Sequence, residues 1–354
     1  MKILLFCENK YAIDILNPIQ EYVTDNHLPH EVLWYIHEKK IDAFAYADKV
    51  RWTKSIQEAY DFSPEAIFVP GNIVPYYLPG VKIQVFHGYA AEKKDHWIIR
   101  RYFDTYFTQG PYFTSHFKAL AQKYGDFEVV ETGWPKQDWI KKNLHRYDDE
   151  KQALLKKSGK QAIILYAPTF SPKLTSLPLP DMKEQFERLA HERNALILMK
   201  FHPLTRQEWA DEYKVWAENH DDIIYIDKGE NVTKYQLMSD VLISDTSSTI
   251  YEFLLLSRPV ITIGTLSKEI YWEDIATPEM LLQAYDHALT DPEAIARRQW
   301  IVDNYDPYLD GHVCERMLNA AADYIRRHGV PAKRRLNLWR KYTSIKTFGK
   351  VHKR

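Results

Sequence analysis

Short apolar runs rich in β-branched residues alternate with amphipathic stretches along most of this 354-residue chain. This alternation is typical of βαβ units, in which crossover helices join parallel strands. Runs such as AIILYA (162–167) and VLIS (241–244) lack polar alternation, as expected for strands that are covered on both faces. The predicted strands are 2–7, 31–36, 66–70, 82–87, 105–108 and 127–132, then 162–167, 195–201, 223–226, 241–244 and 260–263. The predicted helices include 182–193, 207–219 and 312–327.

The strands form two series, separated by the polar and highly charged segment 141–159. A chain of this length is expected to form two domains, at about 100–200 residues per domain. We therefore predict an α/β protein with parallel sheets, in which one Rossmann-like domain spans 1–145 and a second spans 160–310. A C-terminal helix (311–332) and a basic tail (333–354) follow.

The tail carries a strong charge asymmetry. Lys333–Arg354 contains nine of the 47 Lys and Arg residues and no Asp or Glu, which leaves 38 basic against 48 acidic residues elsewhere. Such a block is more typical of an interaction arm than of a folded face, although a solvated tail is the alternative. Interleaved apolar and aromatic residues favour an anionic lipid surface; they are Leu336, Leu338, Trp339, Tyr342 and Phe348. Basic and aromatic residues also mark single-strand nucleic-acid binders, which the acidic body disfavours, so no nucleic acid is expected.

The cysteines and the N-terminal sequence indicate in which cellular compartment the protein is expected to work. Cys7 and Cys314 have no metal-type spacing, which fits a reducing environment. The start, MKILLFCENK, is too short in apolar residues for a secretory h-region of about 7–15. No apolar run approaches the roughly 20 residues of a membrane span. We expect a cytoplasmic protein that attaches to a surface through its tail.

Polar residues follow several predicted strands. Open α/β sheets bind ligands beyond the carboxyl ends of their strands, so these positions define a candidate site. In the first domain they are His87, Gly88, Thr132 and Gly133; in the second they are Pro168, Thr169, Lys200, His202, Asp245, Thr246, Ser247 and Ser248. If the two edges face each other, these residues converge on one cleft.

The stretch SDTSSTIYEF (244–253) leads from a strand into a predicted helix that begins near Thr246. Hydroxyl groups and free amides at a helix start can hold a diphosphate without a Walker lysine. Glu252, one turn further on, is placed to accept hydrogen bonds from ribose hydroxyls. The alternative is that these residues only cap the helix.

Two histidines are candidates for catalysis. His87 at a strand end is suited to take a proton from an attacking hydroxyl, and Gly88 permits a close backbone approach. Lys200 and His202, two residues apart, put two donors on one side of a strand, where they can hold phosphate oxygens. The alternative for each histidine is a structural role, such as a hydrogen bond to a backbone carbonyl.

Several enzyme classes lack their signatures here. HExxH, GxSxG, GxxxxGK[ST], CxxC and GxGxxG are all missing, which argues against zinc hydrolases, triad hydrolases, P-loop proteins and Rossmann dehydrogenases. No acidic cluster indicates a bound metal, so we expect neither a metal site nor a cofactor.

Six segments together resemble, in order, the motifs of the CDP-glycerol glycerophosphotransferases, the family of teichoic acid primases and polymerases. They are LPGVKIQVFHG (78–88), ETGWPKQD (131–138), ILYAPTF (164–170), KFHP (200–203), SDTSSTIYEFLLLSRPVI (244–261) and YLDGHVCERM (308–317). The resemblance covers about residues 70–320. It implies a GT-B fold, with two Rossmann-like domains whose sheets face a central cleft. It also implies that an acceptor hydroxyl attacks the β-phosphorus of a CDP-alditol, that CMP leaves, and that no metal is essential.

The resemblance also implies roles for individual residues. His87 matches the proposed base, and His202 matches a histidine that stabilises the donor phosphates. Ser247 and Ser248 match a serine pair at those phosphates, and Glu252 matches an acidic residue that holds the ribose, often Asp in the family. The loop 89–94 (YAAEKK) departs from the family's Thr-Pro-x-Lys-like continuation, which leaves the acceptor open.

We predict a transferase that moves glycerol phosphate, or a related alditol phosphate, from a CDP-linked donor to a lipid-linked or polysaccharide acceptor in cell-envelope polymer synthesis. It would act at the inner face of the plasma membrane. One alternative is a GT-B glycosyltransferase or 2-epimerase that uses a nucleotide sugar, which the nucleotide base would distinguish. Another is a non-catalytic, membrane-associated scaffold. The alditol, the number of units added and the oligomeric state stay open.

Overall fold

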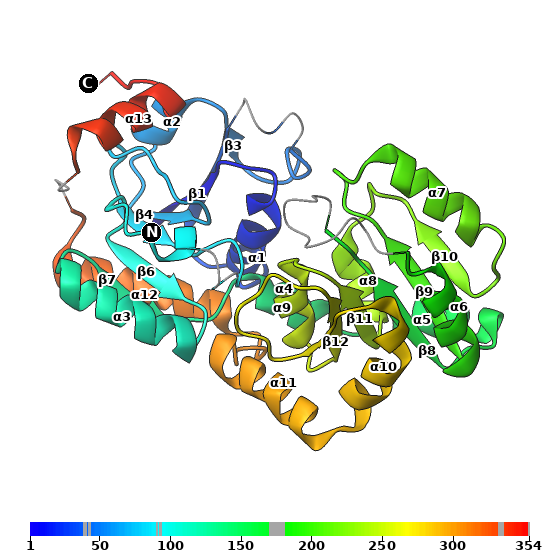
Figure 1. Cartoon of the computed structure of the whole chain (residues 1–354). Coiled ribbons are helices and arrows are strands. Elements are labelled where there is room, and N and C mark those ends of the chain that lie inside the picture. The colour runs from blue at the N-terminus through cyan, green and yellow to red at the C-terminus, as the bar shows by residue number, and fades with distance from the viewer. Residues whose placement is uncertain are drawn as a thin grey trace. The chain divides into compact units, whose positions relative to one another are not determined.

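The computed structural model describes residues 1–37, 41, 44–89, 91, 94–169, 181–331 and 336–352 (Figure 1). Phe170, three residues of the 89–94 loop, and residues 333–335 and 353–354 of the tail lie outside the described residues. The chain divides into two compact units. Unit 1 comprises Met1–Lys142 together with Tyr305–Arg354, and unit 2 comprises Asn143–Asn304.

Unit 1 is built on a seven-stranded sheet in the order β3-β2-β1-β4-β5-β6-β7, with every pairing parallel. The strands are β1 (Lys2–Cys7), β2 (Glu31–Ile36), β3 (Trp52–Thr53), β4 (Ala66–Val69), β5 (Val81–Gln84), β6 (Thr105–Thr108) and β7 (Glu128–Glu131). The chain order runs outward in both directions from β1 and β4. The switch point of the sheet, where α/β proteins bind ligands, therefore lies between these two strands.

Helices cover both faces of this sheet. The helices of unit 1 are α1 (Ala12–Asp25), α2 (Ile56–Asp61), α3 (Pro111–Tyr124), α4 (Lys136–Asn143), α12 (Val313–His328) and α13 (Leu338–Phe348), with a 3₁₀ turn at Lys94–Trp97. α1 and α12 pack together and contact β1 and β5. An apolar cluster on the opposite face joins the sheet to α2, α3 and α13, through residues such as Phe6, Ala59, Phe117 and Phe348.

Unit 2 has a six-stranded parallel sheet in the order β10-β9-β8-β11-β12-β13, with its switch point between β8 and β11. The strands are β8 (Ala162–Tyr166), β9 (Ala195–Lys200), β10 (Ile223–Ile226), β11 (Val241–Ser244), β12 (Val260–Ile263) and β13 (Glu273–Ile275). The helices are α5 (Asp148–Ser158), α6 (Lys183–Glu192), α7 (Gln207–Ala217), α8 (Val232–Met238), α9 (Thr249–Leu254), α10 (Leu281–Thr290) and α11 (Pro292–Tyr305), with a 3₁₀ turn at Pro278–Met280. One apolar cluster packs α6, α7 and α10 on one face, and α8 and α9 contact the sheet outside that cluster.

All eleven predicted strands are present, most with ends within one residue of the prediction. The main difference is β5, which ends at Gln84 rather than at 87, because Phe86 takes a positive φ of 60° that turns the chain out of the sheet. Two strands, β3 and β13, were not predicted. They have two and three residues, too few to show a pattern.

The chain returns to unit 1 at Tyr305, so residues 305–310 and α12 belong with the first sheet. The sequence pattern gives a second domain that extends to 310. Aromatic packing explains the earlier return, since the ring of Tyr305 stacks on Tyr112 at 4.9 Å between centroids.

The prediction of a basic arm separate from any folded face is wrong for residues 336–352. Leu336 and Phe348, which were expected to face a lipid surface, are only 9% and 7% exposed, and the ring of Phe348 lies 5.2 Å from that of Phe6 in β1. The Ser344 hydroxyl accepts the backbone N–H of Tyr76, and His352 exchanges two hydrogen bonds with Gln57 in α2. Figure 1 shows α13 beside α2 accordingly. Within the described ranges, no helix combines the length and the apolar character needed to cross a membrane.

Candidate functional site

His87 lies at the carboxyl edge of the unit 1 sheet, just beyond β5, and its side chain is exposed. Its Nδ1 is 3.2 Å from the carbonyl oxygen of Pro70, which follows β4. A carbonyl can only accept a hydrogen bond, so Nδ1 carries the hydrogen and the lone pair of the neutral ring is on Nε2. This tautomer is the one that a base acting through Nε2 requires.

Three hydrogen bonds fix the loop around His87, two to its backbone carbonyls and one from the side chain of Tyr89. Trp134 Nε1 donates to the Phe86 carbonyl at 3.3 Å, and Gln109 Nε2 donates to the Gly88 carbonyl at 2.9 Å. The Tyr89 hydroxyl donates to Asp306 at 2.7 Å. Gly88 has a φ of 149°, a conformation that favours glycine. The loop that carries His87 is therefore held on both sides of the histidine.

Asp306 is the buried centre of this network, and the sequence patterns do not reveal it. Its carboxylate is 2% exposed and accepts the Tyr89 hydroxyl, the Trp134 backbone N–H at 3.0 Å and the Tyr308 backbone N–H at 3.3 Å. Burial raises the pKa of Asp306 to about 7, although these hydrogen bonds act in the opposite direction.

Two further residues at this edge, Glu8 and Tyr11, were not predicted. Glu8 directly follows β1 and is 5% exposed. The Tyr11 hydroxyl lies 3.4 Å from Glu8 Oε1, and the Tyr11 ring lies 5.4 Å from the ring of His87. The strand-end rule that selected His87 applies equally to Glu8, since β1 was predicted with its correct end.

Thr132 and Gly133, two of the predicted substrate-binding residues, are packed inside unit 1. Thr132 is 1% exposed, and its carbonyl accepts a hydrogen bond from Arg316 Nε. A Cβ on Gly133 would lie 2.8 Å from Val313 and 2.9 Å from Tyr308. These two residues are covered by the segment that returns from unit 2.

In unit 2, Asp245 and Thr169 meet at the switch point between β8 and β11. The Asp245 carboxylate accepts the backbone N–H of Thr169 at 2.9 Å and that of Thr246 at 2.6 Å. Burial raises the pKa of Asp245 to about 6 against the effect of these hydrogen bonds. Pro168 is buried beside them. The predicted residues at the ends of these two strands are thus in direct contact.

The helix predicted to begin near Thr246 begins at Thr249 and has six residues. The backbone at 245–248 forms a turn instead. The Asp245 carboxylate accepts a hydrogen bond from the Thr246 N–H, and the Thr246 hydroxyl accepts one from the N–H of Leu266. Such a short helix has little terminal dipole, so the predicted contribution of the helix end to phosphate binding is reduced.

The hydroxyl groups of this turn divide into two kinds. Ser244 is fully buried and donates to the Ala167 carbonyl at 2.7 Å. Ser247 bonds to the Thr249 hydroxyl and accepts the Thr249 N–H. Ser248 occupies the N-cap position without a side-chain cap and is exposed, and Glu252 is half-buried in the first turn of α9. Ser248 is therefore the most accessible of the predicted phosphate ligands.

Lys200 and His202 follow β9 but differ in environment. Lys200 is 4% exposed and donates to the carbonyls of Phe201 and Lys228, and burial lowers its pKa. His202 is exposed, and its Nδ1 accepts the backbone N–H of Leu204 at 3.1 Å. The hydrogen of the neutral ring is therefore on Nε2, the opposite tautomer to His87. Burial, together with the charge of Lys200, lowers the pKa of His202.

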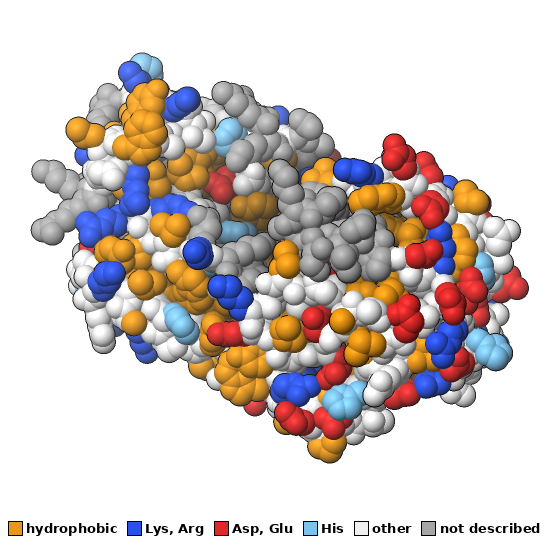
Figure 2. Space-filling model, in the orientation of Figure 1, with side chains coloured by type: hydrophobic (Ala, Val, Ile, Leu, Met, Phe, Trp, Pro, Cys, Tyr) orange, Lys and Arg blue, Asp and Glu red, His pale blue; other side chains and the backbone are white. Residues whose placement is uncertain are grey.

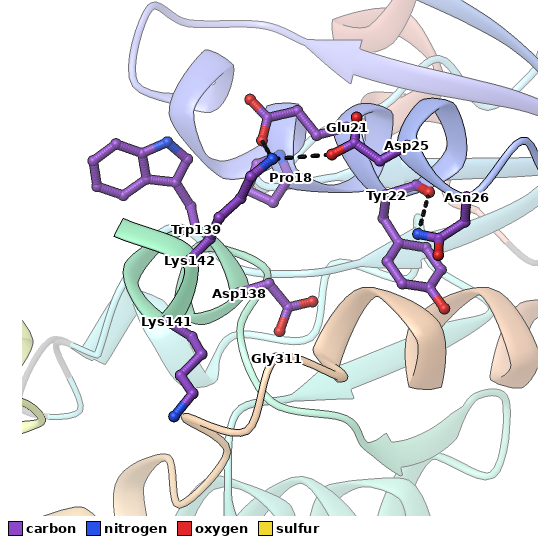
Figure 3. Close-up of a pocket in the computed structure, with 10 residues that line it drawn as sticks. All are labelled: Pro18, Glu21, Tyr22, Asp25, Asn26, Asp138, Trp139, Lys141, Lys142 and Gly311. Atoms are coloured by element: carbon purple, nitrogen blue, oxygen red, sulfur yellow. Dashed lines mark hydrogen bonds and ion pairs between the residues drawn. The ribbon is translucent and has the colours of Figure 1, made fainter. Parts of the chain in front are cut away.

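A pocket of about 260 Å³ in unit 1 contains none of the predicted site residues. As Figure 3 shows, Lys142 reaches across it to Glu21 and Asp25, at 3.6 and 2.9 Å. Asp138 accepts the first backbone N–H groups of α12, from Val313 and Cys314. The pocket thus lies where α1, α4 and the start of α12 meet, and its polar groups join these helices. Within the described part of the chain, no group of three or more His, Cys, Asp or Glu side chains is placed to hold a metal ion.

The chain is thus a two-domain α/β protein, in which the carboxyl edge of each parallel sheet carries polar groups at the place where such sheets bind ligands. Residues 79–322 match the family described as CDP-glycerol:poly(glycerophosphate) glycerophosphotransferase, and the chain belongs to this family. The resemblance noted from the six motifs is therefore confirmed.

The curated relatives are longer than this chain. Teichoic acid ribitol-phosphate polymerase TarK of Staphylococcus aureus is 28% identical over 212 residues, which cover 55% of this chain and 39% of TarK. The teichoic acid glycerol-phosphate primase of Bacillus subtilis is 26% identical, over 55% of this chain and 51% of the primase. The chain thus matches about half of each relative or less.

Solved structures confirm the predicted GT-B fold class. The wall teichoic acid polymerase TagF superposes with a TM-score of 0.64 at 16% identity, covering 92% of this chain and 89% of that one. The complex of S. aureus MnaA with UDP superposes with a TM-score of 0.66 at 14% identity, covering 95% and 99%. At these identities the likeness concerns the fold alone.

The Asp306 network predicts a pH dependence of stability. The pKa of Asp306 is about 7 in the folded chain, against an ordinary value of 3.8, so between these values the folded state binds more protons than the unfolded state. The free energy of unfolding should therefore fall as pH rises through this window, by roughly 4 kcal/mol from this group. We expect Asp306→Asn to remove that contribution, measured by urea unfolding from pH 4 to 8. Asp303→Asn, at an exposed site, should leave the wild-type dependence intact. Equal pH dependence in the wild type and Asp306→Asn would contradict this account.

Proposed function

We propose that this chain transfers glycerol phosphate, or a related alditol phosphate, from a CDP-linked donor to an acceptor hydroxyl and releases CMP. Family membership supports the donor class. Two relatives, a ribitol-phosphate polymerase and a glycerol-phosphate primase, support an alditol phosphate as the group that is moved. The observation that carries the proposal is the opposite tautomers of His87 and His202.

The two tautomers suit two different tasks. With its lone pair on Nε2, His87 can take the proton of the acceptor hydroxyl as that oxygen attacks the β-phosphorus. The bond between the acceptor oxygen and phosphorus forms, the bond from phosphorus to the bridging oxygen breaks, and CMP leaves with that oxygen. With its hydrogen on Nε2, His202 can donate to a phosphate oxygen and stabilise the negative charge. Phosphoryl transfer depends mainly on such positioning and charge stabilisation.

The turn 245–248 is the proposed cradle for the donor phosphates. Asp245 holds the turn against Thr169, which leaves Ser247 and Ser248 at its outer end. Hydroxyl groups here can donate to phosphate oxygens, and Glu252 can accept hydrogen bonds from ribose hydroxyls. Lys200 adds positive charge, although its ammonium already donates to two carbonyls. No metal ion or other cofactor is required in this scheme.

A surface patch on α13 supports a lipid-linked acceptor and a peripheral position at the membrane. Leu338, Trp339 and Tyr342 are 82%, 73% and 56% exposed and lie within about 100° of arc on the helix, opposite the buried Ser344 and Phe348. Apolar and basic side chains gather over α13 in Figure 2. We call Leu338, Trp339, Tyr342 and the exposed Lys346 the α13 patch. Its composition suits the interface of an anionic bilayer.

Calorimetric titration tests the donor. We expect CDP-glycerol or CDP-ribitol to bind in EDTA more tightly than UDP and UDP-N-acetylglucosamine. Ser248→Ala should weaken the binding of the CDP-alditol about tenfold or more, because it removes a hydrogen bond to a charged phosphate oxygen. Thr290→Ala, at an exposed hydroxyl on α10, should have no effect. Preference for uridine would favour a sugar-nucleotide enzyme, and an absence of nucleotide binding would favour a scaffold. A requirement for Mg²⁺ would contradict the metal-free scheme.

Single-turnover kinetics test the base. We expect His87→Asn to reduce turnover at least about 100-fold while the affinity for the CDP-alditol stays unchanged, since general base catalysis contributes about 10²–10⁴-fold. His116→Asn is the matched control, because His116 is also exposed and its Nδ1 also bonds to a backbone carbonyl. Near-normal turnover in His87→Asn would remove His87 from the mechanism.

Vesicle flotation tests the α13 patch. We expect the protein to float with vesicles of 30% phosphatidylglycerol in phosphatidylcholine but not with phosphatidylcholine alone. The double variant Leu338→Glu and Trp339→Glu should lose this binding, whereas Val215→Glu, at a site that is 61% exposed in unit 2, should retain it. Flotation that is unchanged in the double variant would rule out this patch. Competition by single-stranded DNA would point to nucleic acid instead.

A further inference from the structure

The carboxylate of Glu8 lies at the switch point of the unit 1 sheet. β1 and β4 are neighbours there, and their parallel register pairs Leu5 with Phe68. Glu8 follows β1 and Gly71 follows β4, and a Cβ built on Gly71 would lie 1.7 Å from Glu8 Oε1. The Glu8 side chain therefore occupies the space that any other residue at position 71 would fill. The absence of a side chain at Gly71 is what allows a carboxylate in this position.

Gly71 also connects Glu8 with His87. The Pro70 carbonyl, one residue before Gly71, holds His87 Nδ1. Gln84 Nε2 donates to the Gly71 carbonyl at 3.1 Å and so fixes the same turn from β5. The turn after β4 thus positions the imidazole on one side and admits the Glu8 carboxylate on the other.

Tyr11 completes this group. Its hydroxyl lies 3.4 Å from Glu8 Oε1, and Asn9 Nδ2 donates to the Tyr11 hydroxyl at 3.2 Å. The Tyr11 ring packs against the imidazole of His87, with 5.4 Å between centroids and 36° between planes. Tyr11 is 43% exposed, so a ligand from solvent can reach the boundary between the phenol and the imidazole. Burial, and then Glu8, raise the pKa of Tyr11 to about 12, so the phenol keeps its hydrogen at neutral pH.

The chemistry of this group selects what can bind beside His87. An ionised carboxylate only accepts hydrogen bonds, so it binds hydroxyl groups and repels phosphate. A phenol can both donate to and accept from a hydroxyl. We propose that Glu8 and Tyr11 bind the second hydroxyl of the acceptor, so that the reacting end of the acceptor is a neutral vicinal diol. The inference rests on the proposed function only in that it takes His87 as the base for the acceptor.

The test uses histidine resonances of the full chain, without any nucleotide. The protein is labelled in its histidine rings, and the His87 signal is assigned by its loss in His87→Asn. Two isomeric probes are then titrated, 1,2-propanediol, which is a vicinal diol, and 1,3-propanediol, which is not. We expect a saturable shift of the His87 signal with the 1,2-isomer and a shift at least tenfold weaker in affinity with the 1,3-isomer.

Variants assign the effect to the two residues. Glu8→Gln should weaken the 1,2-propanediol response about tenfold or more, because hydrogen bonds to a charged group are the stronger kind. Tyr11→Phe removes only the hydroxyl and should weaken it about threefold or more. Glu58→Gln, at an exposed carboxylate on α2, should match the wild type. If Glu8→Gln fails to fold, as judged by its thermal transition, Tyr11→Phe and the comparison of the two isomers decide the question alone.

Each outcome bears on this inference separately from the proposed function. Equal responses to both diols, or an unchanged response in both Glu8→Gln and Tyr11→Phe, would overturn the inference. Failure of CDP-alditols to bind in the calorimetric titration would overturn the proposed function and leave the diol response as it stands. In an enzyme that turns over, the same two variants should raise the KM for the acceptor and leave the affinity for the donor unchanged.

Discussion

The buried carboxylate of Asp306 is the interaction on which the unit 1 edge depends. It accepts hydrogen bonds from Tyr89, Trp134 and Tyr308, which come from three separate segments of the chain. Trp134 in turn holds the Phe86 carbonyl on one side of His87, and the bond from Tyr89 to Asp306 anchors the loop on the other side. A carboxylate is suited to this task because it can accept several donors at once, and burial strengthens each bond while it raises the pKa of the group. The position of His87 is thus a consequence of how the chain returns from unit 2.

The same arrangement of an acidic side chain against backbone occurs at the switch points of both units. In each, an acidic side chain after the strand on one side of the switch lies against the backbone after the strand on the other: Glu8 against Gly71 in unit 1, and Asp245 against Thr169 in unit 2. The acid is almost completely buried in both cases. In unit 2 the carboxylate accepts hydrogen bonds from backbone N–H groups, and these bonds shape the turn that carries Ser248. In unit 1 it lies against Tyr11, whose ring packs on His87, and we propose that it binds a hydroxyl of the acceptor.

Much of this could be predicted from the sequence, for physical reasons that also explain what was missed. Strands buried on both faces leave continuous apolar runs, so the eleven longer strands were found, and the strand-end rule then led to His87 and Asp245. β13, with its single buried residue Ile275, leaves no such run. The burial of Asp306 and the docking of Phe348 depend on contacts between distant segments, which no local pattern records. The tautomers of His87 and His202 depend on single backbone groups of Pro70 and Leu204, which only the folded turns bring to the rings.

The order of the chain has a consequence for biosynthesis. All seven strands of the first sheet are made before unit 2, but α12 and α13, which cover its two faces, are made after it. A ribosome that has just completed unit 2 therefore holds a nascent sheet whose apolar faces still lack these covers. Unit 2, in contrast, is contiguous and can fold as soon as it emerges. Unit 1 is therefore synthesised first but completes its folding last. During that interval its exposed apolar surface favours aggregation, which binding of a chaperone would prevent.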